Sequence, residues 1–125
     1  MAEKLDAIVQ LGSANSRMKD FYDLFVLARG FDFDGALLVR AIRATFERRK
    51  TPLPVELPTG LTNAFAADPA KAAQWMAFGR KSGAHDAPDL QTTITAIVAF
   101  AEGPLAAAAR GVPFGGRWLP GGPWV

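Results

Sequence analysis

Residues 17–30 read RMKDFYDLFVLARG, and this stretch gives the clearest indication of the architecture. Its apolar side chains recur every three or four residues, as they do along one face of an α-helix. Charged residues fall between them, and the glycine at position 30 ends the pattern. The stretch therefore predicts a helix from about Arg17 to Arg29, with a broad buried face formed by Met18, Phe21, Tyr22, Phe25 and Ala28.

Similar patterns on both sides of this stretch predict two more helices. Residues 2–11 form one, and Gly12 follows it at the position where a helix end favours glycine. The apolar residues of that helix are Leu5, Ile8 and Val9. Asp34 is a good capping residue for a helix over 35–49. The buried stripe expected in that helix is Leu38, Ala41, Ile42, Thr45 and Phe46.

The second half of the chain also reads as helices separated by proline. Prolines between 51 and 58 forbid helix there, and a short helix is expected over 61–66. Asp68-Pro69 starts a helix that reaches about Lys81. Its inward residues are expected to be Ala72, Trp75, Met76 and Phe78. Pro88-Asp89 starts another, with Ile94, Ile97, Val98 and Ala101 inward, and Gly103-Pro104 is expected to interrupt it before a turn over 105–110.

These elements predict an all-α protein, a five- or six-helix array with an irregular Pro/Gly-rich C-terminal tail. The helical domain is expected over 1–110 and the tail over 111–125. The tail carries Trp118 and Trp124. These rings either stack on nucleic-acid bases or pin the tail to the helices, and we favour pinning. For Trp75 and Phe78, a place in the core is likewise favoured over a base-stacking platform.

Composition excludes several classes of site. The chain has no cysteine and one histidine, so thiolate and His-rich metal sites are excluded, and no metal ligands are predicted. That histidine, His85, is expected in an exposed loop without a catalytic role. The apolar stretch 90–101 is too short to span a bilayer, and no N-terminal apolar segment preceded by positive charge indicates a signal peptide, so a cytoplasmic protein without membrane contact is expected.

The net charge of +2 does not by itself indicate nucleic-acid binding. One cluster of basic residues is dense enough to contact a phosphate backbone. The alternative is a solvated helix end, where cations complement the helix dipole, and this is favoured. The cluster consists of Arg40, Arg43, Arg48, Arg49 and Lys50.

The residues best suited to chemistry lie at the start of the helix over 17–29. Asp20 and Asp23 are neighbours at i, i+3, Lys19 reaches Asp23 at i, i+4, and Arg17 lies one turn before Asp20. On spacing alone, a surface helix laced with ion pairs is the favoured interpretation. The alternative is a rigid platform that presents both acids to a phosphate, a metal or a hydroxyl. An antiparallel helix pair would bring Lys4 beside these acids.

Three stretches of the chain resemble the nucleotidyltransferase toxins of the AbiEii/AbiGii type, which belong to toxin–antitoxin (abortive infection) systems. They are AEKLDA at 2–7 with Leu11-Gly12, NSRMKDFYDL at 15–24, and AIRATFERR at 41–49. Trp75 with Phe78 and the tail WLPGGPW at 118–124 are also similar to that family. The Glu-Lys pair and the Arg-x-Lys-Asp-x-x-Asp motif are the more specific parts.

The resemblance implies a function for these residues. In such enzymes an N-terminal domain with a Gly-Ser turn and an Asp-x-Asp pair binds Mg²⁺ and a nucleoside triphosphate, and a helical part adds a lysine and an aspartate. By motif, Lys4 matches the phosphate-contacting lysine and Asp20 the essential aspartate. Asp23 is the second acid, and Arg17 and Lys19 match the basic positions. A cognate antitoxin is also implied.

The chain departs from the family because no Gly-Ser turn and Asp-x-Asp pair precede Lys4. Asp32-Phe33-Asp34 has the letters but is interpreted as a turn and cap between two helices. The helix at residue 2 also lacks a capping segment. We therefore expect a truncated or split product that needs an upstream nucleotidyltransferase domain, binds no Mg²⁺ alone and is inactive alone. The alternative is a noncatalytic helical module that binds an antitoxin or nucleic acid through Arg40–Lys50.

Overall fold

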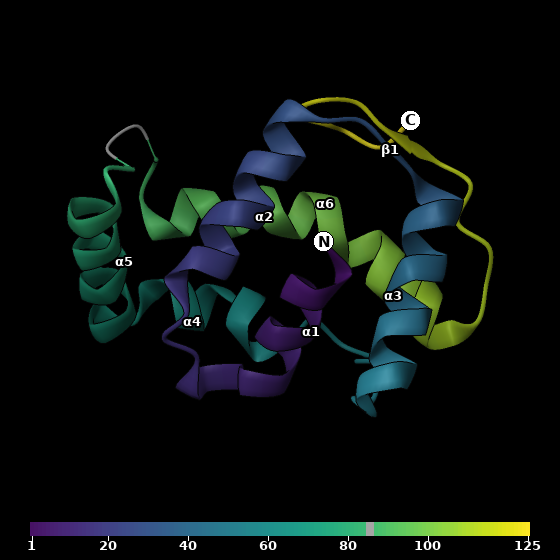
Figure 1. Ribbon diagram of the computed structural model, residues 1–125, viewed down its shortest axis with the longest axis horizontal. Helices are drawn as coiled ribbons and strands as arrows, with labels where there is room; N and C mark the ends of the chain where they lie inside the picture. The colour runs from purple at the N-terminus through teal and green to yellow at the C-terminus, as the bar shows by residue number, and fades with distance from the viewer. Residues whose placement is uncertain (85–86) are drawn as a thin grey trace.

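A computed structural model describes residues 1–84 and 87–125 of the chain and confirms the helical class. The predictions made for His85 and its loop fall outside the described residues. Within the described part, six α-helices account for most of the structure (Figure 1). They are α1 (Ala2–Leu11), α2 (Met18–Gly30), α3 (Gly35–Arg49), α4 (Asn63–Ala67), α5 (Pro69–Ser82) and α6 (Leu90–Arg110).

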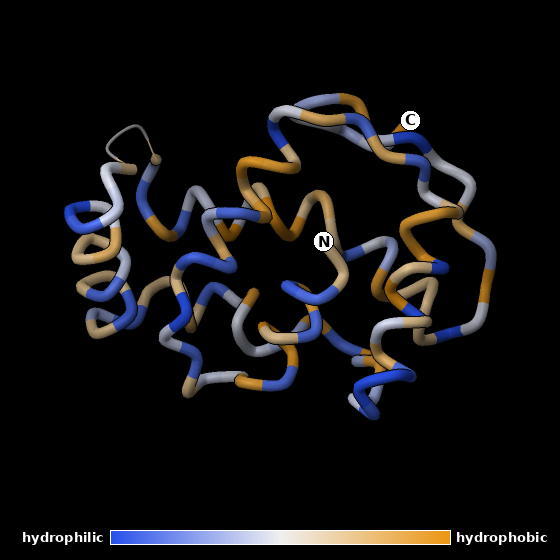
Figure 2. The backbone as a smooth tube through the Cα atoms, in the orientation of Figure 1, coloured by the Kyte–Doolittle hydropathy of each residue, from blue (hydrophilic) through white to orange (hydrophobic). Residues whose placement is uncertain are grey.

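Helix α6 forms the centre of the core. In Figure 1 it runs along the length of the molecule, with α5 at one end and α3 at the other. Figure 2 shows that apolar residues recur along α6 and along α2, which packs against it. The side chains of Ile94, Ile97 and Phe100 are fully buried there. Burial of apolar surface of this kind is the main favourable contribution to folding.

The interruption predicted at Gly103-Pro104 is wrong, because α6 continues through both residues to Arg110. A proline inside a helix cannot donate to the carbonyl four residues earlier, which here belongs to Phe100. The indole Nε1 of Trp124 supplies the missing donor, 2.9 Å from that carbonyl oxygen. The ring of Phe114 packs where a side chain on Gly103 would lie, 2.8 Å from an ideal Cβ. The tail thus stabilises the helix at its weakest point.

The greater length of α6 also bears on the expectation that no segment of the chain could span a membrane. By length and composition alone it could cross a membrane, which the shorter predicted segment could not. Half of its apolar window is buried inside the protein, as is usual for the central helix of a folded domain.

The tail itself lies against the helices. Its strand β2 (Arg117–Trp118) pairs antiparallel with β1 (Phe33–Asp34), a small sheet that the sequence did not predict. Trp118 is buried, and its indole Nε1 donates to the carbonyl oxygen of Ala28 near the end of α2, at 2.7 Å. Both tail tryptophans therefore anchor the tail, as favoured from the sequence.

Several local predictions need correction. In α3 the buried stripe includes Val39 in place of Ala41, which is exposed. In α5, Met76 is 62% exposed although its spacing placed it inward. The short helix expected over 61–66 is divided into a 3₁₀ turn, η2 (Thr59–Leu61), and α4. Helical periodicity predicts the apolar side of a helix, but which positions along the border of that side are covered depends on the elements that pack against it.

Candidate functional site

The first two helices bring the predicted site residues together. Gly12 ends α1 with φ 54°, in the left-handed region that favours glycine. A 3₁₀ turn, η1 (Gly12–Ala14), then reverses the chain, and α2 packs beside α1. Lys4 from α1 consequently faces the first turns of α2, which is the helix pairing expected from the sequence.

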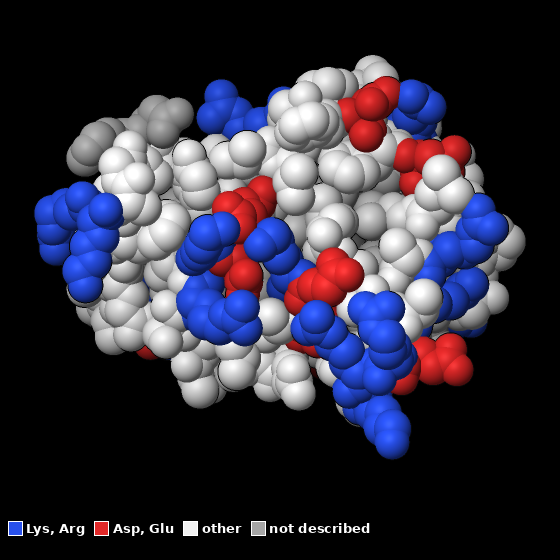
Figure 3. Space-filling view, viewed as in Figure 1, with Lys and Arg blue, Asp and Glu red and all other residues white. Residues whose placement is uncertain are grey.

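Four charged contacts join these side chains. The Nζ of Lys4 lies 2.7 Å from Oδ2 of Asp23 and 3.8 Å from Oδ1 of Asp20. The Nζ of Lys19 lies 2.7 Å from the same oxygen of Asp23. The Nε of Arg17 lies 3.2 Å from Oδ2 of Asp20. The structure therefore places all five predicted site residues in one cluster, and Figure 3 shows blue and red side chains intermixed there.

The two acids have different surroundings. Asp23 holds two lysines: partial burial raises its pKa, but the hydrogen bonds and charges of Lys19 and Lys4 together outweigh this and lower the pKa below its usual value. The hydrogen bond to Asp23 in turn raises the pKa of Lys19. Asp23 is therefore ionised at neutral pH and fixes the position of both ammonium groups.

Asp20 is 5% exposed, and its Oδ2 has no hydrogen-bond partner among the described residues. The nearby Arg17 Nε lies at ion-pair distance from this oxygen without the alignment of a hydrogen bond. A buried carboxylate oxygen without a donor is unusual, because desolvation of a charged oxygen is costly. Asp20 therefore keeps a buried acceptor oxygen that no described donor satisfies and that only the Arg17 guanidinium approaches.

An open groove of about 460 Å³ lies beside Asp20, between the start of α2 and α5. The α2 side is formed by Arg17, Lys19 and Asp20 with their neighbours, and the α5 side by Gln74, Phe78 and Lys81. The sequence did not single out Gln74 or Lys81, since no motif or periodicity connects α5 to the Lys-Asp motif. Phe78 was predicted as core and is half-buried at the groove wall.

The site does not have the ligand set of a magnesium centre. Mg²⁺ prefers octahedral coordination by several oxygens. Within 1–84 and 87–125, no group of three or more Asp, Glu, His or Cys side chains could hold a metal ion. Around Asp20 and Asp23 the neighbours are the cations of Lys4, Lys19 and Arg17. The residues present therefore do not fit Mg²⁺.

The Asp32-Phe33-Asp34 triplet has structural contacts. Asp34 Oδ1 accepts from the backbone N–H of Leu37 at 3.2 Å and caps α3. Asp32 forms an ion pair with Arg117 of the tail. The interpretation of the triplet as a turn and cap agrees with these contacts, although Phe33 and Asp34 also form β1.

The basic cluster near the end of α3 is partly engaged within the protein. Arg43 donates to the carbonyl oxygens of Ala107 and Ala108 at the end of α6. Arg49 lies 3.4 Å from the fully buried Asp6, and Arg48 pairs with Glu3 at 3.8 Å. Three of the five basic side chains therefore have structural contacts within the protein. This weakens the case for a phosphate-binding surface there.

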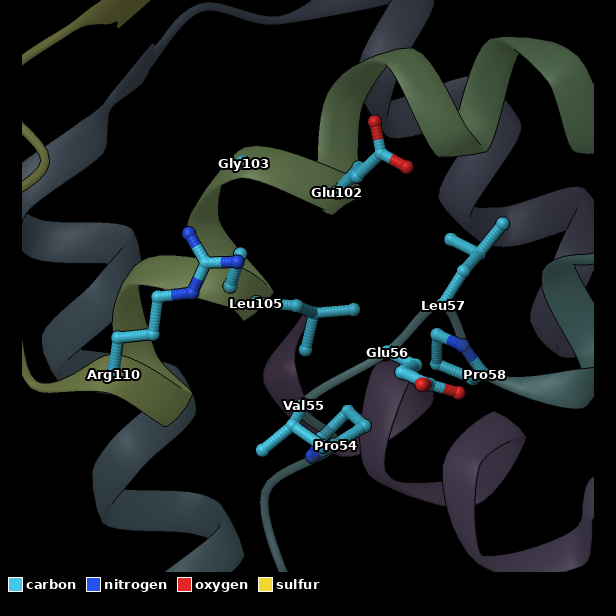
Figure 4. Close-up of a pocket in the computed structure, with 10 residues that line it drawn as sticks. Pro54, Val55, Glu56, Leu57, Pro58, Glu102, Gly103, Leu105 and Arg110 are labelled. Atoms are coloured by element: carbon cyan, nitrogen blue, oxygen red, sulfur yellow. The ribbon is translucent and has the colours of Figure 1, made fainter.

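A separate groove of about 390 Å³ lies between the proline-containing segment 54–58 and α6 (Figure 4). Its polar side chains are Glu56, Glu102 and Arg110. It shares no lining residue with the groove beside Asp20. Arg17, Lys19 and Asp20 of the charged cluster therefore line a groove that is distinct from this one.

Comparison with protein families gives an independent result. A family model described as nucleotidyl transferase AbiEii toxin, type IV TA system, matches residues 1–96. This range contains Lys4, Asp20, Asp23 and the whole of α5, whereas the tail resemblance at 118–124 lies outside it. No curated protein and no solved structure matches the chain.

Proposed function

Because the chain belongs to the AbiEii nucleotidyltransferase toxin family of type IV toxin–antitoxin systems, we propose that Lys4 and Asp20 act in transfer of a nucleotide to an acceptor hydroxyl. The observation that carries this proposal is the ion pair of Lys4 on one helix with Asp20 on the next, where Asp20 lines an open groove. An ion-paired surface helix alone would not require the buried, unsatisfied oxygen of Asp20.

Asp20 is the group that we assign to the acceptor. In nucleotidyl transfer, the acceptor oxygen forms a bond to the α-phosphorus, the bond to pyrophosphate breaks, and the hydroxyl proton must leave. The Oδ2 of Asp20 accepts no hydrogen bond and has only the Arg17 guanidinium beside it, and we assign this oxygen to orient that hydroxyl and take its proton. Loss of an oriented general base typically costs 10²- to 10⁴-fold in rate.

Lys4 is the group that we assign to phosphate. Its ammonium stabilises negative charge on the transferring phosphoryl group. Asp23 holds this ammonium at 2.7 Å, so we assign Asp23 to positioning Lys4. The exposed cations Arg17 and Lys19 line the groove, where they can contact further phosphate oxygens of a bound nucleotide or acceptor.

Magnesium and the triphosphate require a further module in this proposal. Such a module would carry the Gly-Ser turn and the Asp-x-Asp pair and would join the helical domain in cis or in trans. We expect the 125-residue chain alone to transfer no nucleotide. Detectable incorporation of labelled nucleotide into RNA or protein by the purified chain would overturn this expectation.

Family membership also implies a partner and a compartment. A toxin of this type has a cognate antitoxin, which we expect to be encoded nearby, and a nucleoside triphosphate as substrate. We propose that the protein acts in the cytoplasm. A search for the encoding gene's neighbours and a pull-down with the neighbouring product test the antitoxin assignment.

The experiment that tests the proposed function adds a nucleotidyltransferase module to the chain. The chain is combined with a nucleotidyltransferase module containing the Gly-Ser turn and the Asp-x-Asp pair, and incorporation of each labelled nucleoside triphosphate is measured. Asp20→Asn should lower incorporation by about 10²- to 10⁴-fold, and Lys4→Met should also reduce it strongly. Glu102→Gln, an exposed acid in the separate groove, is the matched control and should leave the rate unchanged. Equal activity of Asp20→Asn and the control would refute the assignment.

A further inference from the structure

Lys71 on α5 is a buried cation that the mechanism above does not use. Its side chain is 8% exposed, and its Nζ donates to the carbonyl oxygen of Asn15 at 2.8 Å. The ring of Phe65 lies 5.3 Å from the same nitrogen, within the range of a cation–π contact. No carboxylate of the described residues forms an ion pair with it.

A lysine in this environment needs an explanation. Burial of an ammonium group is costly unless it is paired and hydrogen-bonded, and even buried ion pairs can often be replaced by apolar residues of similar volume without loss of stability. Lys71 has one hydrogen bond to a backbone carbonyl. Its charge is therefore poorly explained as a contribution to stability, and its contact with Asn15 is the feature to explain.

Asn15 lies in the link between α1 and α2. It is fully buried, and its Oδ1 accepts from the backbone N–H of Arg17 at 2.7 Å. Asp20 lies one turn further on, and its own backbone N–H donates to the carbonyl oxygen of Arg17 at 3.1 Å. A continuous series of hydrogen bonds thus runs from α5 through the link into the first turn of α2.

We infer that Lys71 is a positioning residue that fixes the link between α1 and α2, so that Lys4 faces the acids of α2. The link sets how α2 lies against α1, and the Lys4–Asp23 contact joins the two helices across it. The catalytic meaning of this role rests on the proposed function, whereas the geometric role can be measured on the chain alone.

The test follows the carboxyl of Asp23 by NMR as a function of pH in carbon-13-labelled protein. Lys71→Met is expected to raise the Asp23 pKa to the value found in Lys4→Met, because each change removes the Lys4 contact. The double variant should show no further rise, which identifies a shared cause. Arg80→Met, an exposed cation on the same helix, is the matched control and should leave this pKa unchanged.

All variants are measured in about 1 M trimethylamine N-oxide, an osmolyte that favours the compact state. An Asp23 pKa in Lys71→Met equal to that of the wild type would overturn the inference. A Lys71→Met chain that remains unfolded in the osmolyte would also overturn it, because Lys71 would then support the global fold. An additive rise in the double variant would show that Lys71 acts independently of Lys4 and would overturn it as well.

A second measurement separates this inference from the proposed function. In the chain combined with a nucleotidyltransferase module, Lys71→Met should lower kcat by on the order of 10- to 100-fold, with the KM for the triphosphate unchanged, because a small misplacement of reacting groups has an effect of this size. An unchanged kcat in an active enzyme contradicts the role of Lys71 alone. Absence of activity in the wild type and all variants, together with the expected non-additive shifts of the Asp23 pKa, contradicts the proposed function alone.

Discussion

The hydrogen bond from Trp124 to the carbonyl of Phe100 leads to a quantitative prediction. Pro104 cannot donate to this carbonyl, and the indole Nε1 lies 2.9 Å from it. Trp124→Phe removes the donor and keeps an aromatic ring in contact with Phe100. Because Phe100 is fully buried, water does not readily replace the donor. A buried carbonyl left without a donor costs about 1–3 kcal/mol, and we expect a loss near 2 kcal/mol.

The assay is urea denaturation followed by circular dichroism, for the wild type and three variants. In the Pro104→Ala background, the new N–H of residue 104 can donate to the Phe100 carbonyl along the helix. Trp124→Phe should then cost about 1 kcal/mol less than it does beside proline, while the loss of ring contacts is the same in both backgrounds. Equal costs in the two backgrounds, within about 0.3 kcal/mol, would refute the explanation.

Three further predictions concern the charged and tightly packed positions. Arg49→Met leaves the buried carboxylate of Asp6 without its cation. Breaking a buried ion pair usually costs about 3–5 kcal/mol of stability, but solvent screens the half-exposed arginine, so we expect a cost of about 2 kcal/mol. Arg48→Met, which breaks an exposed pair, should cost at most about 0.5 kcal/mol, and equal losses in urea denaturation would contradict this contrast. The folded-state pKa of Asp23 is lowered, so its stabilising contribution is present above the unfolded value of about 4 and is lost as the pH falls through the folded value. Asp23→Asn should therefore lower stability at pH 7 and have little effect well below both pKa values, and a loss of the same size at both pH values would exclude the ion pairs as its cause. Gly35→Ala should destabilise by about 1–3 kcal/mol because an ideal Cβ lies 2.6 Å from the carbonyl oxygen of residue 116, whereas Gly30→Ala meets no atom within 4 Å and should be neutral in thermal denaturation.

Much of the fold was predictable because its boundaries are encoded locally. Asp34, Asp68 and Asp89 each accept a hydrogen bond from the first turn of the helix that follows. For Asp89, hydrogen bonds from Thr92 lower the pKa, as expected for a capping carboxylate. The pairing of Lys4 with the acids of α2 was also predictable, since two short helices joined by a brief link usually pack side by side.

The features that could not be predicted depend on residues far apart in sequence. The continuity of α6 at Pro104 requires a donor from Trp124, and no local pattern at 103–104 reveals it. Gln74 and Lys81 form part of the α5 wall of the groove. Their positions in the sequence do not differ from those of other polar residues on the exposed side of a helix, so no pattern indicates this role. Lys71 reads as a surface residue from its neighbours and is buried because the link around Asn15 closes over it.

The central claim is that Lys4 and Asp20 form one functional unit. The decisive measurement is the rate of nucleotide transfer by the chain combined with a nucleotidyltransferase module, for Lys4→Met, Asp20→Asn and the double variant. Groups that act in the same step give strongly non-additive losses, so the double variant should be about as slow as the slower single variant. Losses that multiply, or an Asp20→Asn enzyme with the wild-type rate, would contradict the claim.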